Sequence, residues 1–315
     1  MYFYSIFDKF FYYFFEFESM IIDVRCRFTG GKSADYYRNQ LQKSGRLPLI
    51  ESLKEGTEES FFKEIEEAGV TTAVSASGFN PGAKLGKYNF ADRTTQNDDL
   101  SEIQQRNPRR FIACGGLDVS NTFHDCLTEI VRCYHELGIK VFQIEPGRAP
   151  GCLPSDNRLD EVYRLLQELD CTVIIQTSGL KGGQYLEYAN PHHIERIAEK
   201  FPYLRIICAH GCYPYVREAI VTAMRRDTIW LSPEGYLWHL GHEDWLRAIN
   251  KNFEGFSSKF LFGTAYPLTP IKAFVDNFMS LPFKEEFLPK LLYKNALDAM
   301  NLKEDPIFKA YYFPE

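Results

Sequence analysis

The sequence lacks the short motifs by which several enzyme classes are recognised. Gly-X-Ser-X-Gly, the usual turn around a serine nucleophile, does not occur in the 315 residues, and neither does a complete phosphate-binding or dinucleotide-binding glycine pattern. Cys-X-X-Cys is absent as well, and Cys208 and Cys212 have no second pair of ligands for a structural zinc site. These absences argue against serine-hydrolase, P-loop, Rossmann and zinc-ribbon chemistry.

A basic surface is also missing. Asp and Glu outnumber Lys and Arg by 42 to 36, which gives a formal net charge of -6 and a pI near 5.7. Proteins that bind nucleic acid generally carry a basic stripe that neutralises phosphates. We therefore expect no nucleic-acid partner.

Residues 1–19 are rich in Phe and Tyr but form no uninterrupted apolar run, because charged residues break the segment from Asp8 onwards. A membrane span needs about 20 predominantly apolar residues, and a secretory signal has a basic start and small residues before its cleavage point. Neither pattern is present, so we expect no membrane association. We interpret residues 1–19 as an extension ahead of a single domain over residues 20–315. An aromatic helix that covers that domain or a partner surface is the alternative.

The eight cysteines are scattered, several of them within apolar runs. This distribution is typical of reduced, buried thiols and favours a cytoplasmic location over a disulfide framework. With 45% hydrophobic and 25% charged residues, the composition is that of a globular protein. The length fits one α/β barrel, which needs roughly 250 residues plus insertions. Composition leaves a homo-oligomer open.

Short β-branched runs alternate with amphipathic stretches, which is typical of parallel strands covered by helices. The eight predicted strands are Ile21–Cys26, Thr71–Ser75, Phe111–Gly115, Lys140–Ile144, Thr172–Gln176, Arg205–Ala209, Thr228–Leu231 and Lys259–Phe262. They predict an α/β fold, a (β/α)8 TIM barrel, with its active site at the carboxyl ends of the strands. The long connection from Phe28 to Glu58 is expected to be a loop or small excursion over that face.

Three segments at predicted strand ends carry a resemblance to a known family. They are Ile22–Arg27, Ile207–Gly211 and Leu261–Pro267, the last of which reads Leu-Phe-Gly-Thr-Ala-Tyr-Pro. In this order they resemble the amidohydrolase-related branch of the metal-dependent hydrolases, and weaker similarity extends over about residues 21 to 302. That family typically ends its last strand in Phe-Gly-Ser/Thr-Asp-Tyr-Pro, where the Asp binds a divalent metal and takes part in proton transfer. Ala265 occupies the Asp position here.

The resemblance implies five metal-ligand positions, of which only His210 keeps a ligating side chain. The His-X-His of the first strand corresponds to Arg25 and Arg27, the His of the fifth strand to Gln176, and the final Asp to Ala265. Catalytic zinc normally has three protein ligands, whereas a protonated guanidinium offers hydrogen-bond donors only. We therefore expect neither a catalytic metal nor another cofactor.

Arg25 and Arg27 lie two residues apart on a predicted strand, so their side chains should point to the same side. Within one pocket they would clamp the carboxylate or phosphate of a small-molecule anion. The alternative is pairing inside the protein with Asp23, Glu145 or Glu234. Both arrangements are compatible if an internal carboxylate pairs with the arginines while no ligand is bound.

The remaining candidates also lie at strand ends. We predict that His210 transfers a proton, assisted by Glu145 or Glu234, while Gln176 orients a carbonyl and Tyr266 contacts the substrate. The predicted function is an amidohydrolase-like hydrolase that cleaves a small anionic amide or lactone without the family's metal. Non-oxidative decarboxylation on the same scaffold is one alternative. A non-catalytic ligand-binding or structural relative is the other, because four ligand positions are lost together.

Overall fold

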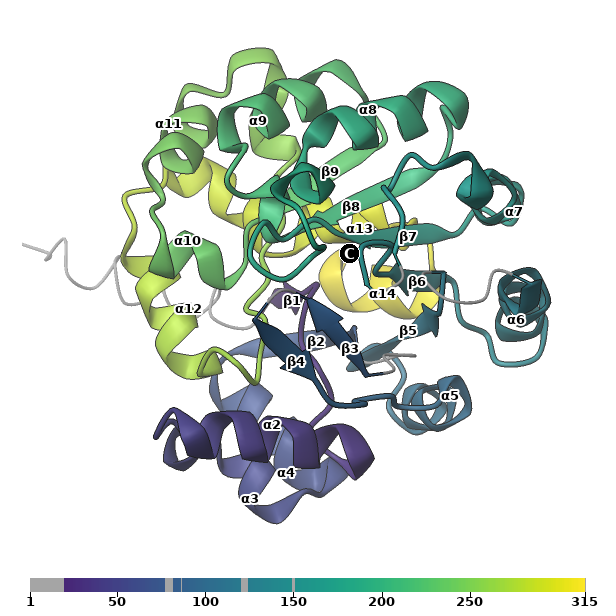
Figure 1. Ribbon diagram of the computed structural model, residues 1–315. Coiled ribbons are helices and arrows are strands. Elements are labelled where there is room, and N and C mark those ends of the chain that lie inside the picture. Colours follow the sequence, from purple (N-terminus) through teal and green to yellow (C-terminus); the bar gives the residue numbers. More distant parts are fainter. Residues whose placement is uncertain (1–19, 77–81, 86, 120–123, 149–150, 315) are drawn as a thin grey trace, which may run out of the picture.

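In the computed structural model, a curled parallel sheet forms the centre of the protein and helices form its outer layer (Figure 1). The structure describes residues 20–76, 82–85, 87–119, 124–148 and 151–314, and the predicted extension over residues 1–19 lies outside them. Seven strands lie in the order β1-β2-β5-β6-β7-β8-β9. Their bounds are Ile21–Asp23, Val70–Ser75, Phe111–Leu117, Val141–Ile144, Thr172–Gln176, Arg205–Ala209 and Ile229–Ser232.

Local signals mark the start of α8 and the buried face of α7. Asn190 caps α8 by accepting a hydrogen bond from the backbone N–H of His192 (3.0 Å), and Pro191 occupies the first turn. Val162, Tyr163 and Leu166 form the buried face of α7. The helices are α2 Gly31–Lys43, α3 Glu51–Glu55, α4 Glu58–Glu67, α5 Asn97–Arg106, α6 His124–His135, α7 Asp160–Glu168, α8 Pro191–Lys200, α9 Val216–Arg225, α10 Gly235–His239, α11 Glu243–Lys251, α12 Ile271–Ser280, α13 Asn295–Ala299 and α14 Pro306–Tyr312.

The predicted eighth strand, Lys259–Phe262, closes the barrel without becoming a regular strand. On one side the N–H of Leu261 donates to the carbonyl of Leu231 (2.9 Å), and on the other the N–H of Val24 donates to the carbonyl of Phe262 (3.1 Å). The N–H of Phe262 donates to the carbonyl of Leu291 instead, which interrupts the ladder. The fold is therefore an α/β barrel of the TIM type, with a bridging segment in the eighth position.

Two connections differ from the expectation. The segment from Phe28 to Glu58 is mainly helical, because Tyr37 and Leu41 bury one face of α2 against the rest of the protein. An unpredicted hairpin of β3 (Ala83–Leu85) and β4 (Tyr88–Phe90) follows β2. Both connections contribute side chains to the pocket described below, so the long connection borders the active face as expected.

The core of the barrel is apolar and continuous with the layer between sheet and helices. All eight cysteines are buried and free, which confirms that they form no disulfide framework. None of the helices in the described part of the chain is long and apolar enough to cross a membrane.

Candidate active site

A cavity of about 200 Å³ opens at the carboxyl ends of the strands. Arg27, which follows β1, lines it together with Gln176 at the end of β7 and His210 directly after β8. Ala265 also lines it and lies in residues 259–267, which we call the closing segment. The parallel strands thus bring four residues that are distant in sequence to one site. Arg25 lies deeper, with no exposed surface.

The lining of this cavity is strongly cationic. Its charged members are Arg27, Arg46, Arg93, Arg148 and Lys181, and we call the cavity the cationic pocket. No carboxylate belongs to the lining as far as the described residues go. Such a surface attracts an anion with more than one negative charge.

Sequence reasoning missed four of these cations. Arg148 follows β6 and Lys181 follows β7 within a few residues. Their closeness to the strand ends could have identified them as candidates for the pocket. Arg46 and Arg93 lie in long connections after β1 and β2, and no local pattern indicates that these fold back over the barrel mouth. The N–H of Arg46 at Nη1 donates to the carbonyl of Leu268 (3.0 Å), which fixes its side chain at the rim.

Glu145 is an ion-pair centre beneath the cationic pocket. Arg93 Nη2 lies 3.2 Å from each carboxylate oxygen, Arg148 Nε donates to Oε2, and Gln143 Nε2 donates to Oε1 (2.9 Å). Burial alone would raise the pKa of Glu145, but the two guanidiniums outweigh it and hold the pKa well below its usual range. The geometry suits an ionised carboxylate that positions Arg93 and Arg148.

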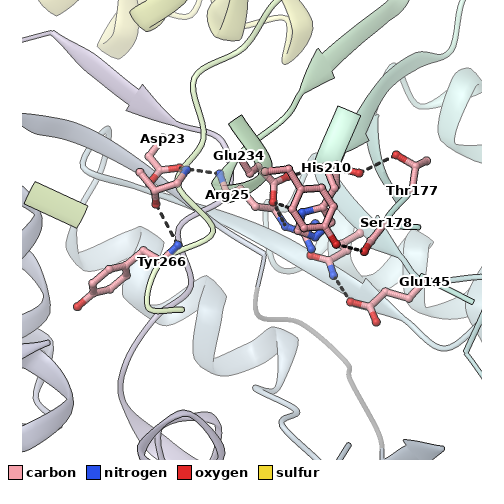
Figure 2. A network of polar contacts seen from close by, with 12 residues as sticks. Asp23, Arg25, Glu145, Thr177, Ser178, His210, Glu234 and Tyr266 are labelled. Carbon is pink, nitrogen blue, oxygen red and sulfur yellow. Dashed lines mark hydrogen bonds and ion pairs between the residues drawn. The ribbon is translucent and has the colours of Figure 1, made fainter. Parts of the chain in front are cut away.

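Glu234 connects Arg25 to His210 (Figure 2). Its Oε2 lies 3.8 Å from Arg25 Nε and 3.0 Å from His210 Nδ1, while its Oε1 accepts a hydrogen bond from the backbone N–H of His210 (3.0 Å). Glu234 is therefore the ion-pair partner of Arg25 among the three carboxylates considered from the sequence. Arg27 forms no ion pair with a carboxylate of the described residues and borders the open pocket.

Burial shifts the proton affinities of this pair. Desolvation raises the pKa of Glu234 to about 7, although Arg25 and Arg27 oppose the shift. Desolvation also lowers the pKa of His210 well below its usual range, and both guanidiniums add to that effect. Near neutral pH the imidazole is therefore neutral, beside a carboxyl group that readily gains or loses a proton. Such a pair suits proton transfer.

A pH-dependent contribution to stability follows from Glu234. Its pKa is higher in the folded protein, about 7, than the ordinary 4.5, so the folded state binds a proton that the unfolded state releases between these values. This contribution is fully present below about pH 4.5 and is lost as the pH rises through about 7. In urea unfolding, we expect the free energy of unfolding of a Glu234→Gln protein to lack this decrease between about pH 4.5 and 7. If the free energies of wild type and variant changed in parallel with pH, this prediction would be wrong.

Three residues at the strand ends adopt a positive φ that side chains disfavour. His210 (66°) follows β8, Glu234 (58°) lies after β9, and Ala265 (60°) lies in the closing segment. Each such conformation costs on the order of 1–3 kcal/mol and persists only where the surrounding structure enforces it, and such residues cluster at functional sites. The strain coincides with the pocket and its proton-transfer pair.

Gly263 allows the closing segment to approach the Arg25–Glu234 pair. A Cβ at this position would lie 2.5 Å from Ser232 Oγ and 3.4 Å from Arg25 Cβ, so no larger residue fits without displacement. The neighbouring Thr264 donates to Asp23 through its N–H (3.0 Å) and its hydroxyl (2.6 Å). The Phe-Gly-Thr part of the motif thus has a structural role even though its Asp is absent.

The structure places Tyr266, the predicted substrate contact, outside the lining of the cationic pocket. Its ring points away from Arg25, Glu234 and His210 in Figure 2, and its hydroxyl donates to Glu64 Oε2 (2.9 Å). It also bonds Ser52 and has no exposed surface. Tyr266 therefore lies outside the lining of the cationic pocket, although the neighbouring Ala265 belongs to it.

The residues at the family's ligand positions do not fit a divalent metal. The described residues contain no group of three His, Cys, Asp or Glu side chains able to hold one. Two guanidiniums, an amide and a methyl group accompany His210 there, and the guanidiniums would repel a cation.

The fold and the site define a TIM-barrel protein whose ligand site lies at the strand ends. Residues 66–301 match the sequence profile of the Amidohydrolase family. This match spans most of the chain, and the protein belongs to that family. No curated protein matches the chain.

Solved structures agree with this fold. An uncharacterised TIM-barrel protein from Bordetella bronchiseptica is 29% identical, with a TM-score of 0.76 over 89% of this chain and 97% of its own. 2,6-Dihydroxybenzoate decarboxylase from Rhizobium is 15% identical, with a TM-score of 0.66 over 90% and 99%. 5-Carboxyvanillate decarboxylase from Novosphingobium aromaticivorans, complexed with manganese, is 16% identical, with a TM-score of 0.63 over 91% and 97%. The two decarboxylases share the fold with this chain.

Proposed function

We propose that this protein hydrolyses the amide or lactone bond of a small polyanionic compound without a divalent metal. The observation that carries the proposal is the His210–Glu234 pair, whose imidazole borders the cationic pocket and is neutral near neutral pH. The cationic pocket supports binding of the anion, and the His210–Glu234 pair supports proton transfer during hydrolysis. The direct test is turnover of a panel of dicarboxylate lactones and amides, with ring opening or amine release as the readout.

In the proposed mechanism His210 is the general base. Its Nδ1 faces Glu234, which leaves Nε2 to reach a water molecule in the pocket. As the water oxygen attacks the carbonyl carbon, the imidazole takes its proton, and the C–O or C–N bond then breaks. The imidazolium returns the proton to the leaving group. Glu234 stabilises the transient imidazolium, and Gln176 and Arg27 line the pocket where the carbonyl oxygen gains charge.

Arg27 should contribute substantially to affinity for the anion. A hydrogen bond to a charged group contributes roughly 1.5–3 kcal/mol, so Arg27→Gln is expected to weaken binding of glutarate about tenfold to 150-fold by calorimetry. Arg164→Gln is the control, because this arginine is exposed and pairs with Glu161. An unchanged affinity in the Arg27 variant would remove it from the binding site.

The proposal also predicts metal-independent turnover. Dialysis against EDTA is expected to leave the hydrolytic rate unchanged, because the donor set offers one imidazole where the family uses several ligands. Elemental analysis of protein purified without chelator should then show substoichiometric divalent metal. Stoichiometric metal bound near Arg25, His210 and Ala265 would contradict the metal-free mechanism.

Non-oxidative decarboxylation is the second candidate function. The raised pKa of Glu234 favours it, because a carboxyl group protonated near pH 7 can donate a proton to a carbanion left by CO2. Release of CO2 from hydroxybenzoates, without ring opening of lactones, would select this alternative. Tight binding of dicarboxylates with no conversion of any substrate would instead indicate a non-catalytic ligand-binding protein.

A further inference from the structure

We propose that Lys181 is a nucleophilic amine that forms an imine with a small anionic oxo acid in the cationic pocket. This activity goes beyond hydrolysis. It rests on the binding half of the proposed function, the affinity of the pocket for a small anion, and it requires no hydrolytic step.

A tight turn holds Lys181 at the pocket. The backbone N–H of Lys181 donates to Ser178 Oγ (3.0 Å), and the N–H of Gly182 donates to the Ser178 carbonyl (2.8 Å). A Cβ at Gly182 would lie 2.4 Å from that carbonyl oxygen, so glycine is required for the turn to close. Ser178 Oγ in turn lies 2.6 Å from Tyr236 Oη on α10. A constrained backbone therefore places the lysine in the loop that follows β7.

The ammonium of Lys181 forms no ion pair with an acidic side chain among the described residues. Its Nζ instead lies 5.5 Å from the centre of the Tyr88 ring. Most lysines near a protein surface either face water or pair with an acid. Lys181 is half-buried, so its side chain is only partly in contact with water.

Cations surround this amine. Burial lowers the pKa of Lys181, and the four arginines of the cationic pocket lower it further. A lysine that is desolvated beside other cations holds a larger fraction of free amine, which is the nucleophilic form. The same arginines would bind the carboxylates of an oxo acid and hold its carbonyl near the amine. The chemistry of the pocket thus matches an anionic carbonyl compound.

His210 lies within electrostatic reach of the lysine. Burial, Arg25 and Arg27 lower the pKa of His210, and Lys181 adds to the shift. The two side chains also line the same cavity. A neutral imidazole at this position can accept the proton that the amine releases.

The proposed step balances without a further reactant. The nitrogen lone pair of Lys181 attacks the carbonyl carbon, and a proton moves from nitrogen to the carbonyl oxygen through His210 to give a carbinolamine. Protonation and loss of the hydroxyl as water then form the C=N bond. Water reverses the sequence and releases both partners, so the enzyme is unchanged unless the imine is trapped.

Reductive trapping tests the proposal. The full-length protein is incubated with 2-oxoglutarate and sodium cyanoborohydride, which delivers hydride to the imine carbon and leaves a stable secondary amine. We expect one adduct per chain by intact mass, located on the peptide that contains Lys181. Excess glutarate, which has no ketone, should suppress the adduct by competing for the pocket.

Two variants separate the amine from general lysine reactivity. Lys181→Arg keeps the positive charge and should lose the adduct while it retains glutarate binding, because a guanidinium forms no such imine. Lys87→Arg is the matched control: Lys87 also lies 5.5 Å from the Tyr88 ring but is exposed and absent from the pocket lining, so this variant should label like wild type. Lys181→Met, also without adduct, supports the assignment if the arginine variant misfolds.

The outcomes distinguish this inference from the proposed function. An adduct that persists in folded Lys181→Arg or Lys181→Met protein overturns the assignment of Lys181. Binding of glutarate with no adduct from 2-oxoglutarate overturns imine formation and leaves the hydrolase proposal standing. Failure of both 2-oxoglutarate and glutarate to bind overturns the anion-binding premise of both proposals.

Discussion

Glu145→Gln is expected to lower the free energy of unfolding by about 3–5 kcal/mol at neutral pH, the usual effect of removing one partner from a buried ion pair. The substitution keeps the shape of the side chain but leaves Arg93 and Arg148 without their shared negative charge. Both arginines are less than one tenth exposed, so water cannot replace the carboxylate. Urea denaturation of the two proteins would measure the difference.

The pH dependence of this loss has a defined sign. Because the pKa of Glu145 is lowered in the folded protein, its contribution is present above the ordinary Glu pKa of 4.5 and is lost as the pH falls through the folded-state value. The gap between wild type and variant should therefore narrow in acid. Glu161→Gln provides the control, since its pair with Arg164 is exposed and should contribute less than about 1 kcal/mol. An equally small effect at Glu145 would show that the ion-pair centre contributes little.

His210→Gln is expected to reduce kcat/KM by about 10²–10⁴-fold, the range that a positioned general base contributes. Affinity for glutarate should change little, because the cations of the pocket remain in place. Steady-state hydrolysis together with calorimetry would separate these two effects.

His239→Gln is the matched control for this experiment. His239 lines the same pocket, but no carboxylate of the described residues pairs with its ring. Its substitution should leave kcat within a few-fold of wild type. Comparable losses in both variants would point to a disturbed pocket rather than to a proton transfer specific to His210.

Local pattern predicted most of the barrel. β-branched runs such as Thr172–Gln176 and Arg205–Ala209 became strands with the predicted bounds, because a parallel strand buried on both faces requires continuous apolar residues. The predicted strand Lys259–Phe262 lies in the expected place but is not a regular strand, since the hydrogen bond from Phe262 to Leu291 depends on how the C-terminal region packs. The helical character of Gly31–Lys43 was missed because its burial is set by the rest of the fold.

The site was only partly predictable for the same reason. Arg25 and Arg27 both follow β1, which ends at Asp23. Arg25 pairs with Glu234, and Arg27 lines one cavity together with Gln176 and His210. Strand-end position also suggested Tyr266, but its ring packs into the helical layer. The catalytic roles of His210, Glu145 and Glu234 and the binding role of Gln176 remain predictions.

The sequence alone determined the order of the strands and the donor chemistry of the family positions, because both depend on residue identity and short-range periodicity. It showed that two arginines, a glutamine and an alanine stand where ligands are expected. Only the tertiary structure decided which charges meet: Arg25 with Glu234, two arginines with Glu145, and Lys181 with the four arginines of the cationic pocket. The physical reason is that ion pairing and desolvation depend on distance and burial, which are set when separate segments pack together.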